Sequence, residues 1–389
     1  MNQAGAIDQI QAAMQARNTL SKAFFDQEAA RLAEVCRQMS ERFLAGGRLL
    51  AFGQGPYATD AQHVSVEFVH PVIVGKRALP ALDLSLYFRP WLEALLRPED
   101  MVMGFAPASG DAEVEAALAF ARQKGALTFA LTGQGADYAV EVATHPFIHQ
   151  EIVEMLYHVL WETVHVFFEH RESRHELGAT SFLYPFLGTE KQDTAALLAE
   201  AAESIRLKVA EDARLRLVVA EQQSEAIASA ASRIAERLER GGKLILFGNG
   251  GSATDANDLA LDCVAPPLGW KPIPAISLAL EPANLSAIAN DVGPEVVFLR
   301  QLIAQARPED VVVGISTSGG SRNILLTLGE ARKRGLLTLA LLGYDGGEVV
   351  RQHLADLAIV VPSDHIPRIQ EVQASVYHVI REQLGVLWH

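Results

Sequence analysis

The sequence is poor in cysteine and in positive charge, and it lacks long apolar runs. Two cysteines in 389 residues, Cys36 and Cys263, argue against a disulfide framework and against a cysteine-rich zinc site. Lysine and arginine number 33 against 47 acidic residues, and the net charge of −14 argues against a nucleic-acid surface. No run approaches the roughly 18 apolar residues of a membrane span. No signal-peptide pattern follows Met1, so a cytoplasmic protein is expected.

A small anionic ligand stays compatible with this composition. Backbone N–H groups and hydroxyls can hold one phosphate inside an acidic protein. Apolar residues make up 49% and charged residues 21% of the chain, which is typical of a folded globular protein. At this length two domains are expected.

The chain contains an internal repeat. Short motifs recur in the same order in its two parts, with the spacing between copies growing from 195 to 210 and then 220 residues. The first copy is therefore shorter, and it lacks counterparts of about 281–296 and 344–353. The recurring motifs are Phe-Gly-(Gln/Asn)-Gly at 52–55 and 247–250, Ala-Thr-Asp-Ala at 58–61 and 253–256, Arg-Pro-Glu-Asp at 97–100 and 307–310, Gln-Glu at 150–151 and 370–371, and Tyr-His at 157–158 and 377–378.

Each copy alternates short apolar runs with helical patterns. In the second copy five such runs are expected to be strands, and the helical stretch from Arg322 ends at Gly335 as a helix cap would. Alternating strands and helices predict a parallel sheet with both faces covered. We expect two tandem α/β domains at 1–175 and 196–389, joined by a connection at 176–195. The expected strands are 244–247, 273–277, 311–315, 337–342 and 357–361.

Two loops of the second copy follow predicted strands and open predicted helices. They read Gly-Asn-Gly-Gly-Ser at 248–252 and Ser-Thr-Ser-Gly-Gly-Ser at 316–321. Glycine allows close backbone approach, and a helix start offers unpaired N–H groups to an anion. Two such loops in one domain favour a phosphate site over ordinary turns and helix caps. The expected phosphate-binding residues are Asn249, Gly250, Ser252, Ser316, Thr317, Ser318 and Ser321.

These motifs resemble those of the sugar isomerase (SIS) domain, and in particular of bacterial phosphoheptose isomerases. The resemblance covers nearly all of 200–389 and includes Ala-Asn-Asp at 289–291 and Arg-Ile-Gln-Glu at 368–371. It implies a doubly wound, flavodoxin-like sheet of five parallel strands, active sites near subunit boundaries, and isomerisation of sedoheptulose 7-phosphate. It also implies substrate contacts from Asp291 and Gln370. Regulators that bind another protein share this fold, so the motifs alone do not establish catalysis.

The resemblance further implies a set of acid–base residues. An aldose–ketose isomerase needs a base, an acid and stabilisation of a developing oxyanion. Family members carry a His-x-x-x-Glu pair after the first glycine loop, and a Gln and a His eight residues apart on the last helix; some bind zinc there. The first copy matches with His63, Glu67, Gln150 and His158. We expect Glu67 and His158 to be catalytic and the four residues to form a candidate zinc site, against the alternative of a solvated helix surface.

The two copies have lost different features. In the second copy Asp258 and Asp262 replace the His and the Glu, so Asp262 and His378 are only secondary catalytic candidates. In the first copy the glycine loop became Gly-Gln-Gly-Pro-Tyr at 53–57. Its hydroxyl loop became Ala-Pro-Ala-Ser-Gly-Asp at 106–111, whose carboxylate would repel phosphate.

Because the losses are complementary, we expect one composite site between the halves of an internal pseudo-dimer, with a homodimer of chains as a further option. The leading interpretation is a phosphosugar aldose–ketose isomerase that binds a small sugar phosphate. One alternative is a non-catalytic phosphosugar sensor or adaptor. Another is a lyase or deaminating enzyme acting on an amino-sugar phosphate. Zinc is the one cofactor considered, and neither nucleic acid nor a membrane is an expected partner.

Overall fold

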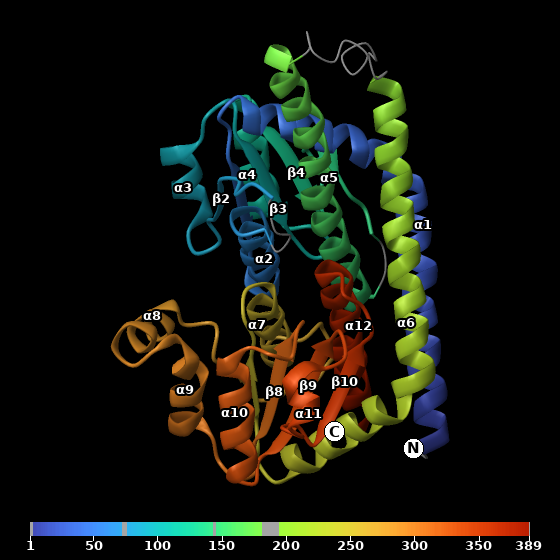
Figure 1. Cartoon of the computed structure of the whole chain (residues 1–389), viewed down its shortest axis with the longest axis vertical. Coiled ribbons are helices and arrows are strands. Elements are labelled where there is room, and N and C mark those ends of the chain that lie inside the picture. The colour runs from blue at the N-terminus through green and yellow to red at the C-terminus, as the bar shows by residue number, and fades with distance from the viewer. Residues whose placement is uncertain (1–2, 72–75, 143–144, 181–193, 389) are drawn as a thin grey trace.

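The chain folds into two α/β halves, each built on a five-stranded sheet (Figure 1). The computed structural model describes residues 3–71, 76–142, 145–180 and 194–388. The strand order is β2-β1-β3-β4-β5 in the first sheet and β10-β9-β8-β6-β7 in the second, and every paired strand is parallel. The predicted fold class is therefore confirmed.

The expected strands of the second copy are all present, with ends that differ by at most two residues. The first half consists of α1 (Gln3–Leu44), β1 (Leu49–Gly53), η1 (Gly55–Tyr57), α2 (Ala58–Val69), β2 (Ala81–Asp83), α3 (Phe88–Leu95), β3 (Met101–Phe105), α4 (Ala112–Gln123), β4 (Leu127–Leu131), β5 (Tyr138–Ala139) and α5 (Pro146–Thr180). The second half consists of α6 (Thr194–Glu239), β6 (Leu244–Phe247), α7 (Gly251–Val264), β7 (Ala275–Ser277), α8 (Pro282–Asp291), η2 (Pro294–Val296), α9 (Val297–Gln305), β8 (Val311–Ser316), α10 (Arg322–Lys333), β9 (Leu337–Gly343), α11 (Gly347–Arg351), β10 (Leu357–Val361) and α12 (Ile366–Leu387).

Helices cover both faces of each sheet. Side chains alternate along a strand, so Leu244 and Leu246 of β6 pack with α6, α7 and α12, whereas Ile245 and Phe247 pack with α9 and α10. The first sheet is covered in the same way, by α1, α2 and α5 on one face and by α3 and α4 on the other. The stretches that the first copy lacks correspond to α8 with η2 and to α11, so whole helices account for the difference in length.

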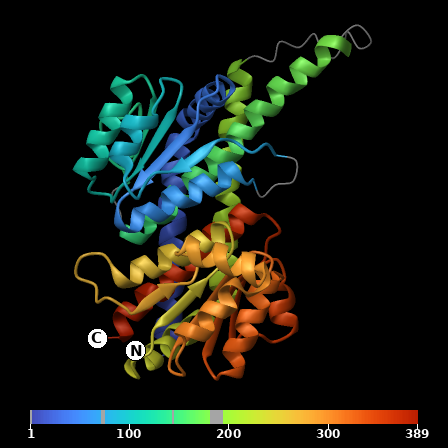
Figure 2. The same cartoon turned by 90° about the vertical axis from the view of Figure 1, so that its left-hand side faces the viewer.

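The two halves are interlocked by their long first helices. α1 and α6 run side by side along one edge of the molecule (Figure 1), the edge that faces away from the viewer in Figure 2. Ile10 and Met14, near the start of α1, belong to the core of the second half. Ala201 and Ile205, near the start of α6, belong to the core of the first half. Each core thus contains a helix segment that lies in the other copy of the repeat.

The connection expected at 176–195 falls mostly on residues 181–193, which lie outside the described residues. α5 continues to Thr180, and α6 begins at Thr194. Cys36 and Cys263 are buried free thiols in different halves. None of the helices within the described ranges has a stretch long and apolar enough to cross a membrane.

Candidate active site

Four helices bring the predicted acid–base residues together at the boundary between the halves. There α2 packs on α7, and α5 packs on α12 (Figure 1). The side chains that they contribute are largely buried. These are His63 and Glu67 from α2, His158 from α5, Asp258 and Asp262 from α7, and Gln370 and His378 from α12.

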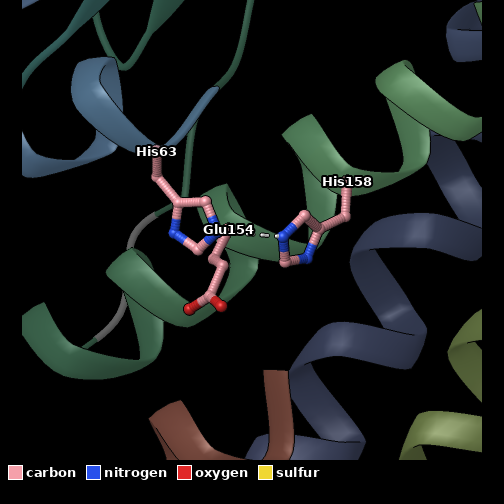
Figure 3. Close-up of side chains that lie close together, drawn as sticks. All are labelled: His63, Glu154 and His158. Atoms are coloured by element: carbon pink, nitrogen blue, oxygen red, sulfur yellow. Dashed lines mark hydrogen bonds between the residues drawn. The ribbon is translucent and has the colours of Figure 1, made fainter. Parts of the chain in front are cut away.

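The first cluster centres on two imidazoles. The Nε2 atoms of His63 and His158 lie 3.3 Å apart (Figure 3). His63 Nδ1 lies 3.3 Å from Asp255 Oδ1, and His158 Nδ1 lies 3.1 Å from Glu371 Oε1. Both carboxylates come from the second half. A carboxylate at Nδ1 fixes the ring orientation, so the two Nε2 atoms are aimed at one point.

Burial and neighbouring charges set different proton affinities for the groups of this cluster. Burial, together with the charges of His63 and Arg368, lowers the pKa of His158 well below its usual value. Burial alone would lower the pKa of His63, but hydrogen bonding to Asp255 and nearby carboxylates raise it. Burial raises the pKa of Glu67 to about 7. The cluster therefore contains a neutral imidazole and a carboxyl group that can exchange a proton near neutral pH.

The two glutamines are exchanged between the halves. Gln370 Nε2 lies 3.3 Å from His63 Nε2, whereas Gln150 donates to Asp262 at 3.2 Å and to Asp258 at 3.3 Å. Gln370 thus takes the place beside His63 that the sequence assigned to Gln150. The reason is geometric: eight residues of helix advance about 12 Å. The glutamines near the starts of α5 and α12 accordingly contact residues of the opposite half. The histidines further along place Nε2 against a residue of their own half, His63 or Asp262.

The second cluster is a closed chain of ion pairs. His378 lies between two carboxylates, with Nδ1 2.9 Å from Glu151 Oε1 and Nε2 3.1 Å from Asp262 Oδ2. Burial opposes its charge, but hydrogen bonds to Asp262 and Glu151 raise the pKa of His378 to about 10. Arg17 donates to Glu151 at 2.9 Å and extends the chain. Both ring nitrogens of His378 therefore face carboxylates, whereas Nε2 of His158 faces the other imidazole.

The predicted phosphate loops lie side by side at the carboxyl ends of the adjacent strands β6 and β8. Asn249 and Asn323 join them through two reciprocal amide hydrogen bonds of 3.0 and 2.9 Å. Ser321 is the N-cap of α10 and makes no side-chain capping bond. In the first half, Asp111 at the equivalent position accepts from the N–H groups of Glu113 and Val114. An internal carboxylate already occupies that helix start.

The glycine loop of the second half touches the imidazole cluster of the first. A Cβ atom added to Gly251, the first residue of α7, would lie 2.7 Å from His63 Nε2 and 2.0 Å from Gln370 Nε2. Any larger residue here would displace the ends of both side chains. The equivalent residue of the first half is Pro56, and Tyr57 follows where the second half has Ser252. Only the second half thus combines a glycine-lined loop with a nearby imidazole pair.

Some residues of this region were missed from the sequence, and one predicted residue lies elsewhere. Glu151 and Glu371, which hold the histidines, stood in the sequence only as part of the repeated Gln-Glu motif. Glu154 lies against His63 and His158, and its one signal is a position four residues before His158. Asp291 is exposed at the end of α8, away from α12, and accepts a hydrogen bond from Asn290 (Figure 1).

Comparison with known proteins identifies the family. The model of the SIS domain matches residues 209–343. The phosphoheptose isomerase of Chlorobaculum parvum is 47% identical over 174 residues, which are 44% of this chain and 82% of that protein. The phosphoheptose isomerase of Helicobacter pylori is 43% identical over 161 residues, which are 41% of this chain and 83% of that protein.

A comparison of folds extends over both halves. The C-terminal domain of glucosamine-fructose-6-phosphate aminotransferase from Francisella tularensis superimposes with a TM-score of 0.61. It covers 96% of each chain at 9% identity and therefore shares the fold alone. The family model and the sequence relatives show that the chain belongs to the SIS-domain family of phosphosugar isomerases, which includes the phosphoheptose isomerases.

Proposed function

We propose that the protein is an aldose–ketose isomerase for a sugar phosphate, with one active site shared between its halves. The observation that carries this proposal is the contact of Gly251, in the glycine loop of the second half, with His63 of the first half. A phosphate on that loop would place the rest of a short sugar beside the imidazole pair. The relatives are named phosphoheptose isomerases, so sedoheptulose 7-phosphate is the substrate to test first.

The second half supplies the phosphate-binding residues. Asn249, Gly250 and Ser318 are exposed, so a ligand can reach both loops from solvent. Ser321, at the start of α10, makes no side-chain capping bond to the N–H groups of the helix. An anion is favoured at such a helix start. The hydroxyls of Ser252, Ser316, Thr317, Ser318 and Ser321 add donors. In the first half Asp111 closes the corresponding position, which explains why only one phosphate site is proposed.

The first half supplies the acid–base chemistry. Glu67 is the base that removes the proton from the carbon next to the sugar carbonyl. With a pKa of about 7, Glu67 can both accept and return a proton near neutral pH. In a metal-free site the Nε2 atom of His158 would exchange protons with the sugar oxygens. Asp262 and His378 neutralise each other in the second cluster, and we infer that their role is structural.

The first cluster also fits a divalent metal. Two ligands at about 2.0–2.1 Å from a tetrahedral zinc ion are about 3.3 Å apart, and the Nε2 atoms of His63 and His158 have this spacing. Both rings are oriented by carboxylates, as is usual for zinc ligands. Within the described residues, the buried Oε1 atom of Gln370, whose amide lies beside His63, lacks a hydrogen-bond partner. A bound zinc would supply Lewis-acid polarisation of the sugar carbonyl.

The test is turnover of sedoheptulose 7-phosphate by the full chain, with and without added zinc, beside Ser318→Ala. An isomerase of this kind converts the ketose to the aldose, and Ser318→Ala raises KM because it removes a phosphate contact. If the parent protein binds the sugar phosphate without converting it, and Ser318→Ala weakens that binding, the protein is a phosphosugar sensor instead. Absence of both binding and turnover would overturn the proposal.

A further inference from the structure

Glu154 is a buried carboxylate for which the acid–base chemistry proposed above has no use. It lies on α5 one turn before His158, so both side chains project from the same face of the helix. Only 5% of Glu154 is exposed. Its Oε1 atom has no hydrogen-bond partner within the part of the chain that the structure describes. An uncompensated buried carboxylate is costly unless a proton or a cation neutralises it.

The surroundings of Glu154 favour a cation. Asp255 and Glu371, the carboxylates that hold His63 and His158, lie behind the two rings and add negative charge to this region. Its carboxylate oxygen and the ring nitrogens of His63 and His158 all lie within 4.8 Å of one another. Figure 3 shows the Glu154 side chain beside the two rings, with its carboxylate below the line that joins their nitrogens. Two imidazoles and one carboxylate are a common ligand set of zinc.

The other half of the molecule has no carboxylate at the position equivalent to Glu154. The position equivalent to Glu154, 220 residues further on, is Ala374. There His378 is held by Glu151 and Asp262 in a closed ion pair. The two halves thus differ in whether a carboxylate stands beside the histidine on its own helix. Glu67 is placed differently again: its Oε1 lies 3.8 Å from His63 Nε2, and Glu67 is not in the group formed by His63, Glu154 and His158.

We propose that Glu154 is the carboxylate that holds a divalent metal together with His63 and His158, which leaves Glu67 free to carry the proton. This inference rests on the proposed function, because it assigns ligands within the same site. It changes the roles of two residues. Glu154 becomes a metal ligand, and Glu67, which the family resemblance made a ligand candidate, becomes a proton carrier alone.

Metal binding separates the two carboxylates without relying on activity. The full chain is titrated with Zn²⁺, its metal content is measured after dialysis, and its Co²⁺ form is examined by visible absorption. We expect Glu154→Gln to weaken metal binding at least about 10-fold and to change the Co²⁺ spectrum. Glu67→Gln should bind within about threefold of the parent protein and keep its spectrum. Asp212→Asn, which removes a buried carboxylate that belongs neither to this group nor to the group formed by Asp258, Asp262 and His378, is the matched control and should behave like the parent.

Each outcome bears on the inference. Parent-like metal binding and spectrum in Glu154→Gln, or loss of metal in Glu67→Gln alone, would overturn the role of Glu154 and leave the proposed isomerase intact. A parent protein that binds no metal would overturn this inference and the metal-assisted form of the proposed function together. If Glu154→Gln does not fold, Glu154→Asp serves instead. It keeps the charge but shortens the side chain, and it must alter the Co²⁺ spectrum for the inference to hold.

Discussion

The Nε2 atoms of His63 and His158 face each other at 3.3 Å, and each ring is held from behind by a carboxylate of the other half. Neither half could build this arrangement by itself. The imidazoles belong to the first copy of the repeat, and Asp255 and Glu371, which orient them, belong to the second. The arrangement of the two imidazoles therefore depends on residues from both copies.

A methyl group at Gly251, in the second half, should disturb the imidazole cluster of the first half. The added Cβ of Gly251→Ala would lie 2.0 Å from Gln370 Nε2 and 2.7 Å from His63 Nε2, so both side chains must move. We expect turnover to fall at least about 100-fold, because catalysis tolerates little misplacement. Gly329→Ala on α10, where the nearest atom is 3.9 Å away, is the control and should keep parent activity. Equal activities of the two variants would show that the contact is unimportant.

One sugar phosphate should bind per chain. The hydroxyl loop of the second half retains Ser318, whereas the first half has Asp111 on its helix start. In isothermal titration with sedoheptulose 7-phosphate we expect a stoichiometry of one. We also expect weaker binding for Ser318→Ala, by about 10-fold if one hydrogen bond to a charged group is lost. Ser109→Ala, in the corresponding loop of the first half, should bind like the parent. Two sites per chain would contradict the asymmetry of the loops.

Truncation of Ile10, which belongs to the first copy, should destabilise the second half of the protein. Ile10 is fully buried in the core of the second half, although it belongs to the first copy. Ile10→Ala should lower the free energy of unfolding by about 2–5 kcal/mol, as for other large-to-small core changes. Leu20→Ala on the same helix removes a side chain that is 37% exposed and should cost much less. Urea unfolding compares them, and similar costs for the two variants would argue against the interlocked cores.

The charge of His378 should make stability fall at alkaline pH. The folded-state pKa of His378 is about 10, above the roughly 6.5 of an unfolded histidine. Its stabilising contribution is therefore complete below about pH 6.5 and is lost as pH rises toward 10. Melting temperatures measured between pH 7.5 and pH 10 should fall more steeply for the parent than for His378→Gln. Parallel profiles would mean that His378 is not held as a cation.

The sequence was sufficient for the sheets because their strands are buried runs. Val311–Ser316 and Leu337–Gly343 have no exposed residue, so apolar runs mark them clearly. The repeat also located the differences between the halves, which proved to be α8 with η2 and α11. The sequence does not show which half of the protein a helix packs against. The apolar pattern of α1 shows that Ile10 is buried but not that it is buried in the other half.

The same limit applies to the site. The repeat shows that Gln150 and Gln370 are equivalent, yet equivalence does not tell which cluster each one joins. The answer depends on how α5 and α12 cross the boundary between the halves. Glu154 was missed for a further reason. Its counterpart is Ala374, so no comparison between the copies could single it out.

The shared site is tested most directly by comparing turnover of Glu67→Gln with that of Asp262→Asn, its counterpart in the second half. Both variants remove one buried carboxylate charge and leave the phosphate loops intact. If the first half supplies the base, Glu67→Gln loses at least about 100-fold in kcat, and Asp262→Asn stays within a few-fold of the parent. The reverse result, an active Glu67→Gln and an inactive Asp262→Asn, would show that the second half works alone and would contradict the shared site.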